Sequence, residues 1–326
     1  MKGGKTMNMA FAGFRHSHIF GLYNSAINNP DVNIVLCYEE DEVAKKEVSS
    51  QYNTHFNCNS YDEILKSEKV DAVAIGDYYG IRGQRIIDAL KAGKHVICDK
   101  PLCTDLKELE IIESLAREKN LKVFCLLDMR YSPQVIKTRK LIKEGIIGDV
   151  VNVSFTGQHC LDYGVRPMWY FEEGKHGGTI NDIAIHGIDV IRFVTRKNLS
   201  KVNCARTWNA FAQKEKHFKD CGQFMVEMEN ISVMADVSYA APKFNGVLPT
   251  YWEFCFWGTD GLLKFNLETN NVYVYKTELE TYPCEKSDIE HIRDFMLEIN
   301  GTKTQMDTFD MLKSQRQVLE IQLKAK

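Results

Sequence analysis

The segment Met7-Asn8-Met9-Ala10-Phe11-Ala12-Gly13-Phe14-Arg15-His16-Ser17-His18 joins a short apolar run to a glycine turn. An apolar run of this kind is typical of a strand that is buried on both faces of a parallel sheet. Because strands and helical patterns alternate through residues 1–130, we predict a doubly wound parallel sheet of the α/β class there. The predicted strands are Met7–Gly13, Val32–Tyr38, Ala72–Gly76, His95–Cys98 and Lys122–Leu126, and the helices include Asp41–Gln51, Ile81–Ala92 and Asp105–Lys119.

The pattern changes after Pro133, where strands follow one another without intervening helices. Residues 131–326 are therefore predicted to form a second, α+β domain with a mostly antiparallel open sheet. Its predicted helices are Gln134–Glu144, Thr179–Thr195, Asp288–Ile299 and Met306–Lys324, and its strands are Val150–Thr156, Val202–Phe211, Gln223–Met228, Ser232–Tyr239, Tyr251–Trp257, Leu262–Leu267 and Val272–Tyr275.

The composition of the 326 residues excludes several classes of protein. Lys and Arg number 41 against 44 Asp and Glu, a near balance that argues against a nucleic-acid-binding protein. No apolar run is long enough to span a membrane, and no signal-peptide pattern follows the first apolar run. The ten cysteines form no Cys-x-x-Cys pair, so we expect reduced thiols in a cytoplasmic protein and predict no metal site.

The turn after the first strand retains one of the three glycines of the dinucleotide-binding fingerprint. Gly13 occupies the first position, whereas Arg15 and His18 occupy the other two. On its own this fragment fits a nucleotide site and a plain strand-to-helix turn equally well. Arg15 either turns outward or places its guanidinium beside the cofactor phosphates. At the end of the second strand, Glu39 can accept hydrogen bonds from the ribose of NAD, or the acidic cluster can simply complement a helix N-terminus.

Two further segments carry groups suited to chemistry. Asp99-Lys100-Pro101 ends a predicted strand, at the edge of the sheet where ligands bind. In Gly177–Asp189, Asp182 and His186 are four residues apart and share one face if the segment is helical. Asp182 also fits a capping box with Thr179, and a single histidine beside an apolar stripe is more often structural than catalytic.

Taken together, these segments resemble the glucose–fructose oxidoreductase/inositol dehydrogenase/MocA (Gfo/Idh/MocA) family. Asp99-Lys100-Pro101 is similar to its Glu-Lys-Pro motif, and Gly177, Gly178, Asp182 and His186 match its Gly-Gly-x-x-x-Asp-x-x-x-His signature. Asp128–Pro133 is similar to its domain junction, and Phe256–Gly261 to its late hairpin. The resemblance spans nearly the whole chain and implies an N-terminal Rossmann domain followed by a substrate-binding and oligomerisation domain.

The resemblance also implies an activity and its residues. The expected reaction is hydride transfer between a sugar, cyclitol or similar polyol and a nicotinamide cofactor, with NAD expected rather than NADP. His186 would be the base for the hydroxyl proton, Lys100 would hydrogen-bond the hydroxyl, and Asp182 would orient the substrate. The residues expected to bind cofactor are Gly13, Phe14, Arg15, His16, Glu39, Asp77, Arg82, Lys100 and Pro101, and those expected to bind substrate are Arg130, His159, Trp169 and Asp182.

Two departures from the family leave alternatives open. Two fingerprint glycines are missing, and Arg82 replaces a histidine that is frequent in the family. Arg15 and Arg82 could compensate by placing positive charge near the phosphates. An NAD-recycling glycosidase or lyase and a non-catalytic dinucleotide- or ligand-binding protein are the alternative functions. The resemblance further implies a homodimer or homotetramer formed through the C-terminal sheet.

Overall fold

The computed structural model describes residues 6–52, 54–246, 248, 250–286, 290–304 and 307–326. These residues form two compact units. The first comprises the described residues of Met1–Leu126 and Glu290–Lys313, and the second those of Leu127–Ile289 and Ser314–Lys326. The predicted domains were residues 1–130 and 131–326, whereas the described residues of Glu290–Lys313 belong with the first unit.

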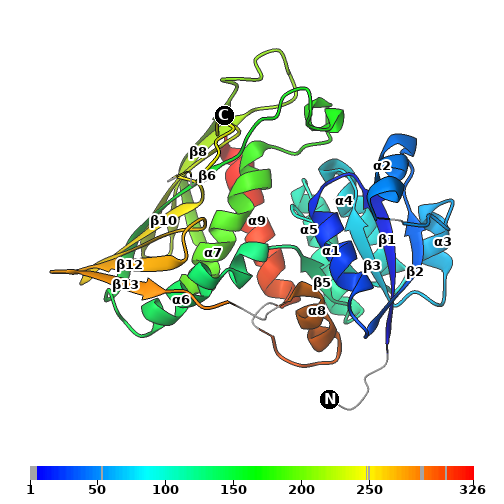
Figure 1. Cartoon of the computed structure of the whole chain (residues 1–326), viewed down its shortest axis with the longest axis horizontal. Coiled ribbons are helices and arrows are strands. Elements are labelled where there is room, and N and C mark those ends of the chain that lie inside the picture. Colours follow the sequence, from blue (N-terminus) through cyan, green and yellow to red (C-terminus); the bar gives the residue numbers. More distant parts are fainter. Residues whose placement is uncertain (1–5, 53, 247, 249, 287–289, 305–306) are drawn as a thin grey trace. The chain divides into compact units, whose positions relative to one another are not determined.

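The first unit contains a five-stranded parallel sheet with the strand order β2-β1-β3-β4-β5. This confirms the predicted doubly wound domain, and Figure 1 shows helices α1 to α5 packed around the sheet. The strands are β1 (Met7–Phe14), β2 (Val32–Tyr38), β3 (Ala72–Gly76), β4 (His95–Cys98) and β5 (Val123–Cys125). The helices are α1 (His18–Ile27), α2 (Glu42–Tyr52), α3 (Tyr61–Lys66), α4 (Tyr79–Lys91) and α5 (Leu106–Glu118).

The returning segment 290–313 covers β5, the edge strand of this sheet. Phe295 of α8 (His291–Ile299) packs on Phe124, with 5.2 Å between the ring centroids. Thr308, the first residue of α9 (Thr308–Lys324), accepts a hydrogen bond from the Val123 amide at 3.1 Å. The contacts satisfy an edge that would otherwise expose backbone donors. The predicted starts of these helices, Asp288 and Met306, lie outside the described residues.

The second unit contains an eight-stranded sheet in the order β13-β12-β11-β10-β6-β9-β8-β7. Only the described pair β6 and β9 is parallel, so the predicted mostly antiparallel sheet is confirmed. The strands are β6 (Val150–Gln158), β7 (Leu199–Trp208), β8 (Cys221–Met228), β9 (Ile231–Ser238), β10 (Glu253–Gly258), β11 (Gly261–Asn266), β12 (Asn271–Tyr275) and β13 (Leu279–Pro283). The unit also contains α6 (Pro133–Lys143), α7 (Ile185–Thr195) and three short helical turns, η1 (Asp128–Tyr131), η2 (Met168–Phe171) and η3 (Ile180–Ala184).

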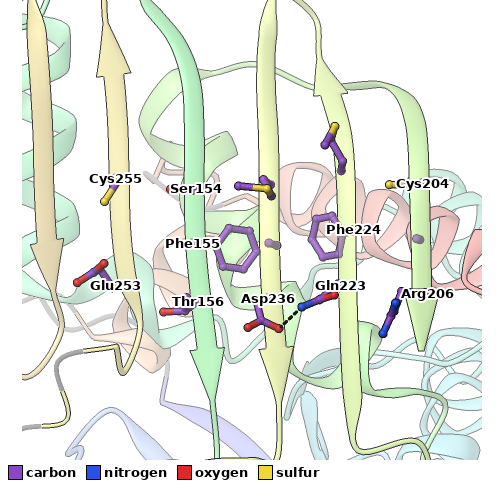
Figure 2. A pocket seen from close by; sticks show the side chains of 14 residues that line it. Ser154, Phe155, Thr156, Cys204, Arg206, Gln223, Phe224, Asp236, Glu253 and Cys255 are labelled. Carbon is purple, nitrogen blue, oxygen red and sulfur yellow. Dashed lines mark hydrogen bonds between the residues drawn. The ribbon is translucent and has the colours of Figure 1, made fainter. Parts of the chain in front are cut away.

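The two faces of the eight-stranded sheet differ in what covers them. Helix α7 and the later turns of α9 lie along one face (Figure 1). Gly187 permits this close packing, because a Cβ atom there would lie 2.1 Å from the Phe155 ring. The opposite face is formed in part by β7, β8, β9, β6 and β10, and Figure 2 shows side chains of these strands. It includes the exposed side chains of Met225 and Met234.

No helix in the described ranges is both long and apolar enough to span a lipid bilayer. All ten cysteines lie in the described part of the chain and are free thiols, most of them buried. Buried free thiols of this kind pack as small apolar side chains.

Candidate functional site

In the first unit, the turn between β1 and α1 approaches the end of β3 closely. Gly13 has a φ of +80°, and a Cβ atom there would lie 2.7 Å from the backbone nitrogen of Asp77. The amides of Arg15 and His16 both donate to the carbonyl of Gly76. The turn therefore needs glycine at the first fingerprint position, as dinucleotide-binding turns do.

The side chain at the second fingerprint position is held by an acidic cluster at the end of β2. Arg15 lies 2.8 Å from Glu39, 3.3 Å from Asp41 and 3.9 Å from Glu40, measured from guanidinium nitrogen to carboxylate oxygen. Glu39 is buried and also accepts a hydrogen bond from the Phe14 amide at 2.6 Å. The guanidinium group of Arg15 is thus engaged with these three carboxylates.

Asp77, which follows β3, is a buried carboxyl group beside the same cluster. Burial, with the nearby charge of Glu39, raises the pKa of Asp77 to about 6, although Arg85 opposes this shift. The Nε atom of Arg85 lies 3.7 Å from the Asp77 carboxylate. Asp77 is therefore ionised near neutral pH, but less readily than an exposed aspartate.

Asp99, the residue in place of the family glutamate, is fully buried at the end of β4. Its carboxylate lies 2.5 Å from Nδ1 of His16 and 3.3 Å from Arg82. Burial alone would raise the pKa of Asp99, but His16 and Arg82 outweigh burial and hold that pKa well below its usual value. Burial conversely lowers the pKa of His16 to about 4. We interpret these residues as an ionised Asp99 that accepts a hydrogen bond from the Nδ1–H of neutral His16.

Arg82 is hydrogen-bonded to the backbone of the segment that carries Lys100. Arg82 is buried and donates to the carbonyl oxygens of Lys100 at 2.6 Å and Pro101 at 3.1 Å. The Lys100 ammonium lies 6.0 Å from the centroid of the Tyr79 ring. Arg82 thereby fixes the backbone that carries Lys100, a role that the sequence did not indicate.

Three side chains near this segment are spaced like metal ligands. Ligand atoms of His16, His18 and Asp99 lie within 4.8 Å of one another. The carboxylate of Asp99 is, however, already neutralised by the guanidinium of Arg82. Since a positive neighbour opposes the binding of a second cation, we assign these residues to a charge pair and not to a metal site.

In the second unit, the signature segment begins with a wide helical turn. Gly177 and Gly178 have φ angles of +78° and +100°, and the following residues Ile180–Ala184 form a π-helical turn before α7. π-turns of this kind are frequent at functional sites. Thr179 makes no side-chain cap, so the capping box with Asp182 is not formed.

Asp182 lies in a buried hydrogen-bonded network with two residues that the sequence did not single out. The Tyr239 hydroxyl donates to the Asp182 carboxylate, and Nε2 of His176 lies 3.3 Å from the same oxygen. Burial, together with the charge of Asp182, raises the pKa of Tyr239 well above its usual value, so the hydroxyl stays protonated. The three side chains are almost inaccessible to solvent.

His186, four residues further on, has different neighbours. Its ring packs edge-on against Trp252, with 5.7 Å between the centroids, and its Nδ1 lies 3.5 Å from the Asp128 carboxylate. His159 contacts both Trp252 and Tyr239, at 5.8 Å and 6.3 Å between centroids. We call His159, Asp182, His186, Tyr239 and Trp252 the site cluster. Asp182 and His186 are thus connected by successive contacts: Tyr239 contacts Asp182, His159 contacts Tyr239 and Trp252, and Trp252 contacts His186.

The other predicted substrate residues lie in packed surroundings. Arg130 is buried and forms a bidentate ion pair with Asp189 of α7. Trp169 is buried and packs on Tyr170, with 4.1 Å between ring centroids. Of the four predicted substrate residues, His159 and Asp182 are therefore in the site cluster, whereas Arg130 and Trp169 have mainly structural contacts.

Several residues of the cluster could not be identified from the sequence. Tyr239 follows β9, and Trp252 precedes β10 with a φ of +46°, a conformation that only the folded chain reveals. Gly157 accommodates this tryptophan, since a Cβ atom there would lie 2.8 Å from its ring. A weak signal existed for His176, which directly precedes the paired glycines.

Comparisons with known proteins agree with these observations. Residues 8–126 match the model "Oxidoreductase family, NAD-binding Rossmann fold", and residues 135–264 match the "GFO/IDH/MocA C-terminal domain". The chain is 29% identical to levoglucosan dehydrogenase of Pseudarthrobacter phenanthrenivorans over 50% of this chain and 42% of that protein. It is 24% identical to scyllo-inositol 2-dehydrogenase (NADP(+)) of Bacillus subtilis over 60% of this chain and 54% of that protein. The matches thus span about half the length of these relatives.

The fold also resembles that of solved structures. A putative oxidoreductase from Erwinia carotovora atroseptica superposes with a TM-score of 0.87 at 20% identity, covering 98% of this chain and 99% of the other. At that identity, the likeness concerns the fold alone.

Proposed function

Because the chain belongs to the Gfo/Idh/MocA family of oxidoreductases with an NAD-binding Rossmann fold, we propose that it is a dehydrogenase of a sugar, cyclitol or similar polyol. The observation that supports this most is the retention of Lys100, Asp182 and His186, each buried and each with ordered neighbours. A protein that only binds a ligand has no chemical need for all three. The relatives named as dehydrogenases support the same class of reaction.

The residues of the first unit are suited to hold a nicotinamide dinucleotide. The left-handed turn at Gly13 places the start of helix α1 at the end of the sheet, where such cofactors bind. Glu39 retains acceptor capacity for a ribose, since a carboxylate has about four lone-pair sites. When bound, the cofactor supplies the acceptor for a hydride.

The chain's own residues then handle the proton and the charge. In this proposal His186 accepts the proton of the substrate hydroxyl, because an imidazole can change protonation near neutral pH. Lys100 donates a hydrogen bond to substrate oxygen and stabilises negative charge that develops there. Asp182, held by Tyr239 and His176, fixes the start of the signature helix and orients a neighbouring substrate hydroxyl.

The charge around Glu39 favours NAD over NADP. When all groups are ionised, four carboxylates face two guanidinium groups, which leaves an excess of two negative charges. The carboxylates are those of Glu39, Glu40, Asp41 and Asp77, and the guanidinium groups are those of Arg15 and Arg85. An additional ribose phosphate would be repelled by this excess. We therefore propose NAD as the cofactor.

We expect the protein to bind NAD about tenfold or more tightly than NADP, because the extra phosphate meets the acidic cluster. Isothermal titration of protein purified without added cofactor measures both affinities. Glu39→Gln, which preserves the shape of the side chain, should weaken NAD binding and reduce the ratio of the affinity for NAD to that for NADP. Glu68→Gln, at an exposed position of the same unit, is the control. Equal affinities for NAD and NADP in the wild type would contradict the assignment.

The same preparation tests the proposed reaction. Mass spectrometry identifies any nucleotide that copurifies, and NAD reduction is followed with a panel of sugars and cyclitols. Turnover of a member of the panel supports the dehydrogenase. A retained NAD that does not exchange would favour the recycling enzyme, and failure to bind either nucleotide would remove the redox proposal.

We further propose that the open face of the eight-stranded sheet joins copies of this chain into a homodimer or homotetramer. This face forms a hollow of about 540 Å³ lined by residues of β6, β7, β8, β9 and β10 (Figure 2). Met225 and Met234, which are paired across β8 and β9, are exposed lining residues of this hollow, and exposed apolar surface of this kind marks interaction sites.

Light scattering is expected to give at least twice the monomer mass. Met234→Asp places a charge in the hollow and should shift the protein toward the monomer by weakening the contact about tenfold or more. Val43→Asp, at an exposed apolar position of the first unit, should leave the mass unchanged. A monomeric wild type at micromolar concentration would refute the proposal.

A further inference from the structure

The turn η1 is fixed onto helix α7 by a buried ion pair. Arg130 of η1 and Asp189 of α7 are each about 1% exposed and form a bidentate contact. The Ser314 hydroxyl donates a further hydrogen bond to Asp189 at 2.6 Å. Since both partners are desolvated and fully engaged, the position of η1 along α7 is strongly determined.

This anchoring brings a second acid–base pair together. Asp128 precedes Arg130 by two residues, and His186 precedes Asp189 by three, roughly one helical turn. Nδ1 of His186 consequently lies 3.5 Å from the Asp128 carboxylate. The imidazole is nearly buried, whereas the carboxylate of Asp128 is 60% exposed.

The other charged groups around His186 are committed elsewhere. Arg130 and Asp189 neutralise each other, and Asp182 on the preceding turn accepts from Tyr239. Toward the strands, the ring meets Trp252, beyond which lies His159. Tyr251, whose pKa is raised by burial and in part by Asp128, adds no charge at neutral pH. Asp128 is thus the carboxylate in direct reach of the His186 ring within the described residues.

We propose that Asp128 is a positioning residue for His186: its carboxylate holds the proton on Nδ1 and so presents the lone pair of Nε2 to the substrate hydroxyl. This inference deepens the proposed function and rests on it. In the step, the hydroxyl O–H bond breaks, an N–H bond forms at Nε2, and the imidazolium that results is stabilised by Asp128, which stays ionised. The proton later passes from Nε2 to water.

The arrangement separates the roles of two aspartates. Asp182 has a buried carboxylate held by Tyr239 and His176, so in this proposal it orients the substrate and does not set the protonation of His186. Asp128 is 60% exposed, and its carboxylate lies 3.5 Å from Nδ1, the nitrogen that must carry a proton in this proposal. Of the two aspartates, Asp128 is the one whose carboxylate lies within ion-pair distance of a His186 ring nitrogen.

Nuclear magnetic resonance of the full-length protein labelled with ¹⁵N-histidine tests this without a substrate. Among nine histidines, the His186 signals are assigned by their loss in His186→Gln. Asp128→Asn is expected to lower the pKa of His186 by about half a unit to one unit and to decrease the fraction of the Nδ1–H tautomer. Asp128→Glu should restore part of the His186 pKa and part of the Nδ1–H tautomer fraction. Glu285→Gln, which removes an exposed charge of the same unit, should change neither.

An unchanged pKa and tautomer in Asp128→Asn would overturn the inference, whether or not the protein proves to be a dehydrogenase. If the screen supplies a turned-over polyol, the acidic limb of the kcat/KM profile should move down by the same amount in Asp128→Asn. The loss should fall on kcat, about tenfold, with little change in KM. A failure of the screen alone would count against the proposed function and leave the resonance experiment decisive for Asp128.

Discussion

His186→Ala is expected to lower kcat about 10²–10⁴-fold on the polyol that the protein oxidises fastest, because it removes the base that accepts the hydroxyl proton. The affinity for NAD should stay within about twofold of the wild type, since the groups proposed to hold the cofactor lie in the first unit. Initial rates of NADH formation and isothermal titration measure the two quantities.

The controls must distinguish loss of the catalytic base from loss of packing in the second unit. His186 is buried against Trp252, so the variant leaves a space in the second unit. His186→Gln preserves more of the volume and should lose nearly as much activity. His217→Ala, at an exposed position, should retain the wild-type rate. Full turnover by a folded His186→Ala protein would eliminate His186 as the base.

The parallel sheet could be predicted almost residue by residue. β3 and β4 have the bounds that their apolar runs indicate, because a strand buried on both faces must be apolar without interruption. β13 was missed for the opposite reason. Its five residues, Leu279–Pro283, alternate between exposed and half-buried and carry no apolar signal. An edge strand of this kind forms because it pairs with a neighbouring strand, and the sequence of the edge strand alone carries no information about that pairing.

The unit boundary shows a similar limit. The apolar face of an amphipathic helix indicates that the helix packs against another element but not which one. The helix α8 could therefore be predicted, but its position against β5 could not. The contact of α8 with β5 depends on Phe295, and that of α9 depends on the hydroxyl of Thr308; neither residue is distinctive in sequence.

For the site, sequence spacing located the signature residues but not their neighbours. Asp182 and His186 were expected on one α-helical face, yet the π-turn between Ile180 and Ala184 gives them separate partners. Tyr239 lies directly after β9, Trp252 lies directly before β10 and Asp128 lies in η1, so tertiary structure alone brings these partners together.

Arg130→Met is expected to lower the free energy of unfolding of the second unit by about 3–5 kcal/mol. The substitution keeps an unbranched apolar stem but leaves Asp189 as a buried carboxylate without its counter-ion. Such a charge cannot recover its hydration inside the protein, and the remaining hydrogen bond from Ser314 does not neutralise it. The cost should therefore exceed that of a lost surface ion pair several-fold.

Tryptophan fluorescence during denaturant unfolding measures this effect selectively, because all four tryptophans (Trp169, Trp208, Trp252 and Trp257) belong to the second unit. Lys201→Met, which breaks the exposed contact with Glu227, should cost less than about 1 kcal/mol. The double variant Arg130→Met, Asp189→Leu removes both charges and should recover most of the loss. If Arg130→Met costs no more than Lys201→Met, the pair does not anchor η1 to α7. The position of Asp128 beside His186 would then need another cause.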